Sequence, residues 1–423
     1  MKTKLSIKLE LQNGKKEKSI DLNIHKENKF LLNSDSSIMD LHLIGTTVFE
    51  IEKFISPESK FYNAKIKKIT LPITTELNQD DKQQLNNLLN QLFLFLYKKD
   101  LTFTFEHVKY DAKTNDDSNL DLKYDSVMLF SGGLDSSIGL DYCKSKFNNT
   151  LLVYERHGNA GQLTPLITKL ENSLIKPKGM NLIRVAGPKQ ISGHFANTRG
   201  LLYLLTGSLF TSKNNSPLII SECGVTMYQP RFGPLYQVTY TTHPLIVQIG
   251  KEIVRIITKK EIEIQFPFEN NTKAEMIKQY GNDDNIANSF SCLSNLRYVK
   301  AKGNCGDCYA CLVRRLGILA ARNDPTKYSE KNKLADIKHI KEKLYPIISF
   351  CYRAITDFDG LDYWQKERII KYQKKELFQR FALDTFIALE NISKTEKLPD
   401  WAEQFLKGID KNLISERKKQ LRK

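Results

Sequence analysis

The sequence lacks the features that mark several common protein classes. No run of about 18 apolar residues occurs in the chain, and the start, Met1-Lys2-Thr3-Lys4-Leu5-Ser6, alternates instead of leading into a signal-peptide core. Neither GKS/GKT nor GxGxxG follows the strand-like run at residues 127–130, which excludes a Walker A loop and a Rossmann fingerprint there. We therefore expect a cytoplasmic protein without membrane contact.

Cysteine is scarce, and its spacing is more informative than its number. Seven cysteines in a reducing compartment are poor material for disulfides, so a cluster of them indicates a metal site or catalysis. The charge is unbalanced, since 64 Lys and Arg against 48 Asp and Glu give a net charge of +16. This excess favours ATP, nucleic acid or an acidic partner protein as ligand, although a lysine-rich genome produces the same composition. Among these ligands we do not favour nucleic acid.

Residues 1–120 predict a small α+β domain. Two alternating apolar runs with a turn signal between them indicate a β-hairpin: Leu5, Ile7, Leu9 and Leu11, then Asn13-Gly14, then Ile20, Leu22 and Ile24. Further strands are expected near residues 41–51 and 101–108. Between these strands, apolar residues at helical spacing predict one amphipathic helix: Leu85, Leu88, Leu89, Leu92 and Phe93.

Residues 121–322 predict a doubly wound α/β domain with a mainly parallel sheet. Short apolar runs alternate there with helical stretches, as in buried parallel strands joined by helical crossovers, and they lie at residues 127–130, 151–154, 182–185 and 218–220. Residues 323–423 predict a domain of three or four helices, broken at Pro346, Asp359-Gly360 and Pro399. The final residues, 417–423, are expected to form a basic tail that frays.

A glycine-containing loop follows the first of these parallel strands. It reads Ser131-Gly132-Gly133-Leu134-Asp135-Ser136 and leads into a helical pattern. Paired glycines let backbone N–H groups approach phosphate oxygens at a helix N-terminus, and the serines add hydroxyl donors. Asp135 can hold Mg²⁺ or cap the helix. A capped glycine turn without a ligand is the simpler alternative, but the complete string in this context favours a nucleotide site.

Four of the cysteines predict a metal centre. Cys292 precedes Cys305, Cys308 and Cys311, and the two-residue gaps among the last three allow neighbouring thiolates to converge on one ion. Zn²⁺ is the expected metal, with an iron–sulfur cluster as the alternative. A site filled by four sulfurs leaves no open coordination position, so we expect a structural role.

The two motifs together carry a resemblance to known enzymes. The loop resembles that of the PP-loop (HUP-like) ATP pyrophosphatases, and with the cysteine pattern and Arg314-Arg315 it resembles the QueC family of 7-cyano-7-deazaguanine synthases over residues 126–320. That resemblance implies that residues 131–136 bind ATP, that the substrate is a 7-carboxy-7-deazaguanine-like carboxylate, and that the enzyme is a carbon–nitrogen ligase. Its product would be an amide or a nitrile.

The same resemblance implies roles for residues outside the two motifs. Arg199 and Lys273 would contact phosphate and, with Asp135, carry catalysis, whereas Glu222, Gly224 and His243 would line the nucleotide and substrate site. A solvated charge at a helix start is the alternative for Arg199, and a packed or capping histidine is the alternative for His243.

The chain also departs from the housekeeping synthases. It carries long segments before and after the core, and it reads Tyr154-Glu155-Arg156-His157 where those enzymes carry a Tyr-Gly-Gln step. This layout resembles the QatC-type, QueC-like proteins of bacterial anti-phage operons, which implies other protein subunits as partners and an amine on one of them as acceptor. A tRNA-modifying PP-loop enzyme and a nucleotide-binding scaffold without turnover are the alternatives.

Overall fold

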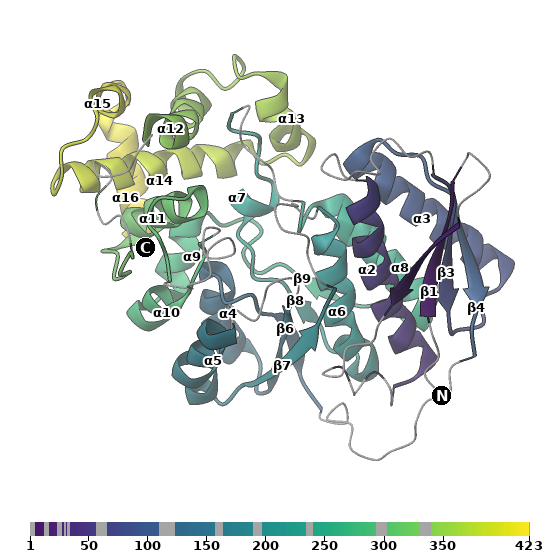
Figure 1. Cartoon of the computed structure of the whole chain (residues 1–423). Helices are drawn as coiled ribbons and strands as arrows, with labels where there is room; N and C mark the ends of the chain where they lie inside the picture. Colours follow the sequence, from purple (N-terminus) through teal and green to yellow (C-terminus); the bar gives the residue numbers. More distant parts are fainter. Residues whose placement is uncertain are drawn as a thin grey trace.

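The computed structural model describes residues 5–11, 17–22, 28, 31, 34–55, 66–109, 123–156, 164–188, 197–233, 240–292, 303–329, 333 and 340–422. A parallel sheet occupies the middle of the molecule, as Figure 1 shows, with a smaller sheet and its helices on the right and a group of helices at the upper left. The N-terminal and C-terminal segments therefore lie on opposite sides of the central sheet.

The central sheet is entirely parallel. Its strands are β5 (Ser126–Leu129), β6 (Thr150–Arg156), β7 (Asn181–Ala186), β8 (Leu218–Ile219) and β9 (Ile264–Gln265), in the order β7-β6-β5-β8-β9. The chain moves outward from β5 in one direction and then returns to place β8 and β9 on the other side. This order confirms an α/β fold with a parallel sheet, and it puts the point where the strand order reverses between β5 and β8.

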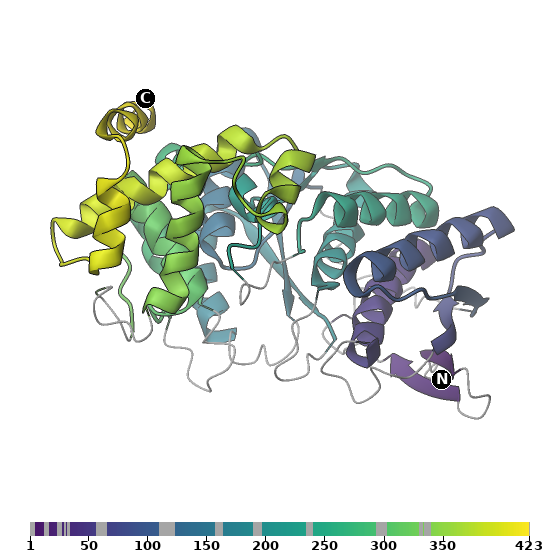
Figure 2. The same cartoon turned by 90° about the horizontal axis from the view of Figure 1, so that it is seen from above.

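Helices bury both faces of this sheet. Val127 and Val153 belong to a core shared with α6 (Arg199–Asn214) and α8 (Pro244–Thr258), whereas Met128 and Leu152 belong to the opposite core with α4 (Leu134–Lys146) and α5 (Thr164–Leu170). Figure 2 shows these helices on the two sides of the strands. Burial on both faces explains why the strands appear in the sequence as nearly continuous apolar runs.

The N-terminal sheet has four strands in the order β2-β1-β3-β4. They are β1 (Leu5–Leu11), β2 (Glu17–Leu22), β3 (Ile66–Ile73) and β4 (Phe103–His107), and two helices accompany them, α2 (Ser36–Ile55) and α3 (Gln79–Tyr97). The antiparallel pairing of β1 and β2 confirms the expected hairpin, and α3 confirms the expected amphipathic helix. Ile7 and Leu71 of this sheet share a core with Leu205 and Ile253, so the N-terminal elements pack directly on α6 and α8.

The prediction of a strand near residues 41–51 is wrong, because this segment lies inside α2. Contacts with β3, α6 and α8 surround α2, and Leu41, Ile44 and Phe49 are almost fully buried. A helix that is buried on several sides shows no polar face, so its apolar run resembles that of a strand. Gly45 lets α2 approach α6 closely, since a β-carbon there would lie 3.1 Å from Leu202.

The C-terminal segment forms five described helices, more than the three or four expected. They are α12 (Ile340–Thr356), α13 (Tyr363–Lys371), α14 (Lys375–Ser393), α15 (Asp400–Lys407) and α16 (Lys411–Arg422). Breaks occur at Asp359-Gly360 and Pro399 as predicted, but Pro346 lies inside α12, where burial of Leu344, Ile347 and Ile348 offsets the cost of a helical proline.

A further correction concerns the end of the chain. Residues 417–422 of the predicted fraying tail belong instead to α16, and the Arg417 side chain is only 3% exposed. The C-terminal helices share one core with α7 (Gly224–Met227), α9 (Lys273–Tyr280) and α11 (Tyr309–Ala321), as the burial of Met276, Leu316 and Phe378 shows. The C-terminal helices therefore pack directly on the elements that follow β8 and β9.

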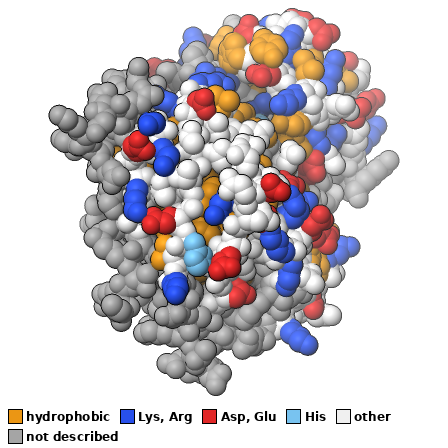
Figure 3. All heavy atoms as spheres, turned by 90° about the vertical axis from the view of Figure 1, so that its right-hand side faces the viewer, with side chains coloured by type: hydrophobic (Ala, Val, Ile, Leu, Met, Phe, Trp, Pro, Cys, Tyr) orange, Lys and Arg blue, Asp and Glu red, His pale blue; other side chains and the backbone are white. Residues whose placement is uncertain are grey.

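Charges of both signs lie side by side on the face of the molecule that Figure 3 shows. On the face formed by the right-hand side of Figure 1, basic and acidic side chains are interspersed (Figure 3). Among the described residues, no helix combines the length and the apolar character that crossing a membrane requires.

Candidate active site and metal centre

The glycine loop lies directly after β5, at the edge where the strand order reverses. Gly132 has φ of +77°, and a β-carbon on it would lie 2.7 Å from the ring of Phe290, so only glycine fits this position. Ser131 Oγ accepts a hydrogen bond from the N–H of Gly133 at 3.2 Å and lies 3.2 Å from Ser136 Oγ. The sequence thus folds into a tight turn that leads straight into α4.

Helix α4 begins without a side-chain cap. Gly133 is its N-cap residue in extended conformation, and it has no side chain that could accept from the first turn. The N–H of Leu134 donates to Ser291 Oγ at 3.4 Å, which is a long hydrogen bond. Asp135 is the acidic residue of this first turn, and Lys273 balances its charge, so the positive end of the helix dipole can still attract an anion.

Asp135 and Lys273 form an ion pair beside this loop. Lys273 Nζ donates to Asp135 Oδ1, and the N–H of Cys223 donates to Asp135 Oδ2 at 3.3 Å. The two side chains are only 13% and 16% exposed. Burial lowers the pKa of Lys273, but the charge and hydrogen bond of Asp135, together with Cys223 and Glu222, raise the pKa by more, so the amine stays protonated. The structure thus brings together two of the predicted catalytic residues from positions 138 residues apart.

Glu222 adds a second carboxylate close to this pair. It follows β8, and Thr242 Oγ1 donates a hydrogen bond to it. Burial raises the pKa of Glu222; the Thr242 hydrogen bond lowers it, the charge of Asp135 raises it further, and Lys273 and Arg199 oppose that rise. These effects require the four charged groups to lie near one another at the carboxyl edge of the sheet.

Arg199 begins α6 and lies between two acidic residues. Its charge lowers the pKa of Glu222 and also that of Glu155, whose pKa burial raises to about 8. Glu155 is near the end of β6, and Thr206 Oγ1 donates to its Oε2 at 2.9 Å. Arg199 is half-buried and acts on both acidic groups, so it is not a solvated helix-start charge.

Two predicted site residues have mainly structural contacts. Gly224 lies against the backbone, since a β-carbon there would be 1.9 Å from the carbonyl oxygen of Glu269. His243 caps α8 by accepting from the N–H of Leu245 at 3.2 Å, and its ring packs 4.8 Å from that of Phe95. Burial, followed by the charges of Arg368 and Lys371, lowers the pKa of His243 to about 3. In this structure a neutral capping and packing role describes His243 best.

The four predicted cysteine ligands converge. The sulfurs of Cys292, Cys305, Cys308 and Cys311 all lie within 4.8 Å of one another, and the Cys305–Cys311 and Cys292–Cys308 pairs are 3.9 Å apart. Four sulfurs around a tetrahedral zinc, with Zn–S bonds of about 2.3 Å, lie about 3.8 Å apart, so the observed spacing fits. These cysteines can hold a metal ion such as zinc.

Backbone groups around Cys305 favour its thiolate form. The N–H groups of Asp307 and Cys308 both donate to Cys305 Sγ at 3.3 Å, and the turn between them needs Gly306, whose φ is +85°. Hydrogen bonds from the other three thiols, and then from the N–H of Asp307, lower the pKa of Cys305 against the opposing effect of burial. A thiolate is the form that binds metal.

The metal centre is joined to the glycine loop through the residues just before Cys292. The N–H of Phe290 donates to the carbonyl of Gly132 at 2.9 Å, and Ser291 accepts from Leu134. Asn304, which precedes Cys305, accepts from the N–H of Ser291 at 2.9 Å. A metal bound by the cysteines would therefore fix the segment that forms one wall of the loop.

One residue that sequence reasoning missed positions Arg199. Glu52 of α2 accepts hydrogen bonds from the N–H groups of Asn197 at 2.6 Å and Thr198 at 3.0 Å, just before α6 begins. Nothing in the sequence around Glu52 indicates this contact, since the two segments are about 145 residues apart. The N-terminal unit thus contributes to the site by orienting the start of α6.

No protein-family model matches the chain, and no curated protein matches it.

Proposed function

We propose that this protein is a PP-loop ATP pyrophosphatase that activates a carboxylate as its adenylate and transfers the acyl group to an amine. The observation that carries this proposal is the ion pair of Asp135 and Lys273 beside the uncapped start of α4. Buried cations, bare helix amides and serine hydroxyls at the point where the strand order reverses are suited to a nucleoside triphosphate.

In the proposed reaction the protein supplies positioning and charge. An oxygen of the substrate carboxylate attacks the α-phosphorus of ATP, the bond from that phosphorus to the bridging oxygen breaks, and pyrophosphate leaves. An amine then attacks the carbonyl carbon of the adenylate and loses a proton, AMP departs with the bonding electron pair, and an amide remains. Loss of water from a primary amide gives a nitrile.

Named residues have distinct roles in these steps. The amides near Gly133 and the amine of Lys273 would hold the departing pyrophosphate, and Arg199 would offset the charge that develops on the α-phosphate. Glu222 and Asp135 provide oxygen donors close to one another, a donor set that suits Mg²⁺. Mg²⁺ held there would neutralise phosphate charge, and zinc on the four cysteines would supply rigidity alone.

For the substrate we propose a 7-carboxy-7-deazaguanine-like carboxylate, on the basis of the sequence resemblance. The same resemblance extends the proposal to anti-phage defence and to an amine on a partner protein as acceptor. The remaining cysteines argue against thiolation of tRNA, because Cys143, Cys223 and Cys351 are all buried and burial raises the pKa of each thiol, to about 12, 11 and 12.

Pyrophosphate release tests the proposal. Purified protein with ATP and Mg²⁺ is given 7-carboxy-7-deazaguanine, bulk tRNA or no addition, and pyrophosphate is measured. We expect release that depends on the deazaguanine, and a mass increase on a co-expressed partner if a protein amine is the acceptor. Release that depends on tRNA would instead identify a tRNA-modifying enzyme, and ATP binding without release would identify a scaffold.

A further inference from the structure

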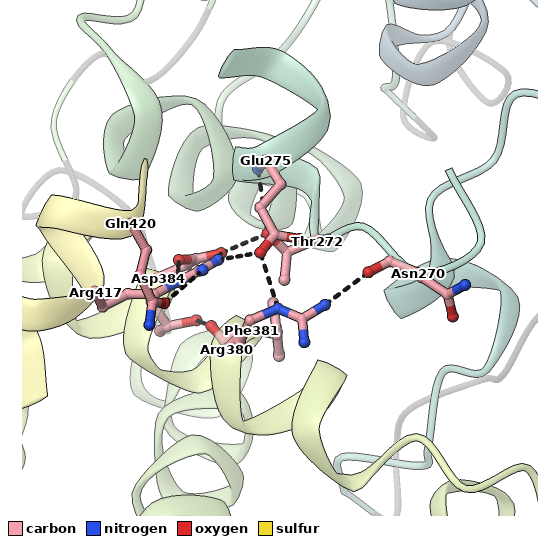
Figure 4. A network of polar contacts seen from close by, with 9 residues as sticks. Asn270, Thr272, Glu275, Arg380, Phe381, Asp384, Arg417 and Gln420 are labelled. Atoms are coloured by element: carbon pink, nitrogen blue, oxygen red, sulfur yellow. Dashed lines mark hydrogen bonds and ion pairs between the residues drawn. The ribbon is translucent and has the colours of Figure 1, made fainter. Parts of the chain in front are cut away.

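A buried polar network connects the last helix of the chain to α9, as Figure 4 shows. Arg417 of α16 donates from Nε to Asp384 Oδ1 at 2.8 Å and from a terminal nitrogen to Glu275 Oε1 at 2.7 Å. Arg417 and Asp384 are only 3% and 4% exposed. Burial would lower the pKa of Arg417, but the hydrogen bond and charge of Asp384 raise it, so the guanidinium remains charged inside the protein.

This network encloses the first turn of α9. Thr272 and Glu275 form a capping box, in which Thr272 Oγ1 accepts from the N–H of Glu275 and Glu275 accepts from the N–H of Thr272 at 2.8 Å. The hydroxyl of Thr272 donates to Asp384 at 2.5 Å. Arg380 holds the same carboxylate of Glu275, with Nε 2.8 Å from Oε1. Both residues of the capping box are therefore held by the C-terminal helices.

Lys273 lies between these two capping residues. It is the first residue of α9, and its aliphatic stem lies against Gly317 of α11, where a β-carbon would be 2.9 Å from Lys273 Cγ. Three parts of Lys273 are thus held in place: the capping box holds its backbone, α11 supports its stem, and Asp135 holds its amine. A buried charged pair contributes little net stability unless every hydrogen bond is satisfied, so this arrangement favours specificity of position over stability.

We propose that Arg417 and Asp384 are positioning residues, which set the place of the Lys273 amine at the glycine loop by holding the capping box of α9. Neither residue touches the loop itself. This inference rests on the proposed function only for its effect on turnover, since the position of Lys273 can be measured without any substrate. The C-terminal helices are then a part of the active site and not an appended module.

Chemical labelling of lysines tests the position directly. The full-length protein is treated with acetic anhydride, and the labelling rate of each lysine is followed by mass spectrometry. In Arg417→Ala we expect the reagent to label Lys273 about 10-fold faster than in the unaltered protein, because a misplaced amine leaves Asp135 and becomes accessible. Lys178 serves as an internal control, since it is also ion-paired, with Asp141, at a similar 17% exposure but outside the network. Its labelling rate should stay unchanged.

Lys418→Ala is the matched control variant. Lys418 is the next residue of α16 and pairs with Glu390 at 2.7 Å, outside the capping box. In the Lys418→Ala variant, Lys273 should be labelled at the same rate as in the unaltered protein. If Arg417→Ala does not fold, the labelling of Lys178 will accelerate as much as that of Lys273. Asp384→Asn and Arg417→Lys then provide further variants. In a folded variant that lacks the guanidinium, an unchanged rate at Lys273 would overturn the proposal.

Turnover provides the second readout. Arg417→Ala should lower kcat for pyrophosphate release by about 10- to 100-fold, the range expected for a misplaced group. In a Lys273→Ala background the same substitution should cost nothing more, whereas a purely structural role would give additive losses. Additive losses would contradict the proposal. Absence of pyrophosphate release in the unaltered protein, with faster labelling in Arg417→Ala, would reject the proposed function and leave the positioning role in place.

Discussion

Two parallel strand–helix–strand units in this molecule differ in the cap at the start of their helix. In β3–α3–β4, Asn78 caps α3 by accepting from the N–H of Asp81 at 2.8 Å, and the first turn carries Asp80 and Asp81. In β5–α4–β6, Gly133 takes the cap position without a capping side chain, and the first N–H of α4 makes only a long hydrogen bond to Ser291. Both units form the same local fold, but only the first satisfies its own helix N-terminus.

The acidic residue in each first turn shows the same contrast. Asp81 pairs with Lys259, whose side chain is 60% exposed, whereas Asp135 pairs with Lys273, whose side chain is 13% exposed. A surface pair contributes little, and a buried cation next to a bare helix start attracts an anion. The proposed nucleotide site depends on this difference, in which a helix start without its own cap lies beside a largely buried cation.

Removal of the metal should separate the two units most strongly. Because Phe290 and Ser291 connect the cysteine centre to residues 132–134, stripping the metal with a chelator should loosen α4 and leave α3 intact. We expect backbone amides in residues 131–137 to exchange hydrogen about 100-fold faster, equivalent to about 2.7 kcal/mol of local stability. Amides of residues 79–97 serve as the control and should exchange at the unchanged rate. Equal acceleration in both helices would show that the metal centre has no special connection to the loop.

Substitution of the paired aspartates should give the next largest effect. Asp135→Ala removes the partner that holds Lys273 and should lower the rate of pyrophosphate release by about 100-fold, as for loss of a group that positions charge. Asp81→Ala removes the equivalent pair of α3 and should change stability by less than about 1 kcal/mol, with no change in turnover. Steady-state kinetics and thermal unfolding of the two variants check this. Similar turnover in both would remove the functional difference between the crossovers.

The smallest effect concerns the second strand of each unit. Near the end of β6, burial raises the pKa of Glu155 from 4.5 to about 8, whereas Glu106 of β4 is 52% exposed and pairs with Lys8. The folded protein binds the proton of Glu155 more tightly than the unfolded chain does. Its stabilising contribution is therefore complete below about pH 4.5 and is lost as the pH rises toward 8.

The melting temperature tests this difference between the strands. Between pH 5 and pH 8 it should fall by a few degrees less in Glu155→Gln than in the unaltered protein, because the glutamine has no proton to lose. Glu106→Gln should leave the pH dependence as it is. An identical pH profile in Glu155→Gln would show that Glu155 is ionised in the fold.

Local patterns in the sequence predict the central sheet, the glycine loop and the cysteine cluster, whereas Lys273, Glu222 and Arg199 entered the candidate site through the family resemblance. The parallel strands, the loop at residues 131–136 and the cysteine spacing each depend on residues close together in the chain, and the structure brings Asp135, Lys273, Glu222 and Arg199 to one edge of the sheet. His243 instead caps α8, and its ring packs on Phe95 of α3 and on Tyr372, which follows α13.

Other features depend on distant partners that no local pattern reveals. The segment at residues 41–51 is helical because elements from three parts of the chain surround it. Arg417 is buried because Asp384 and Glu275 receive it, and these acceptors lie 33 and 142 residues away. A basic run at the end of a chain looks like a solvated tail until its acceptors are known. The contact of Glu52 with the start of α6 could not be predicted for the same reason, because the two segments are far apart in the chain.

A crystal structure with a non-hydrolysable ATP analogue and Mg²⁺ tests the central claim most directly. We predict that the triphosphate lies on the backbone amides between Gly132 and Ser136, with the amine of Lys273 within hydrogen-bonding distance of a phosphate oxygen. Phosphates bound elsewhere on the molecule, with the start of α4 and Lys273 left untouched, would contradict it.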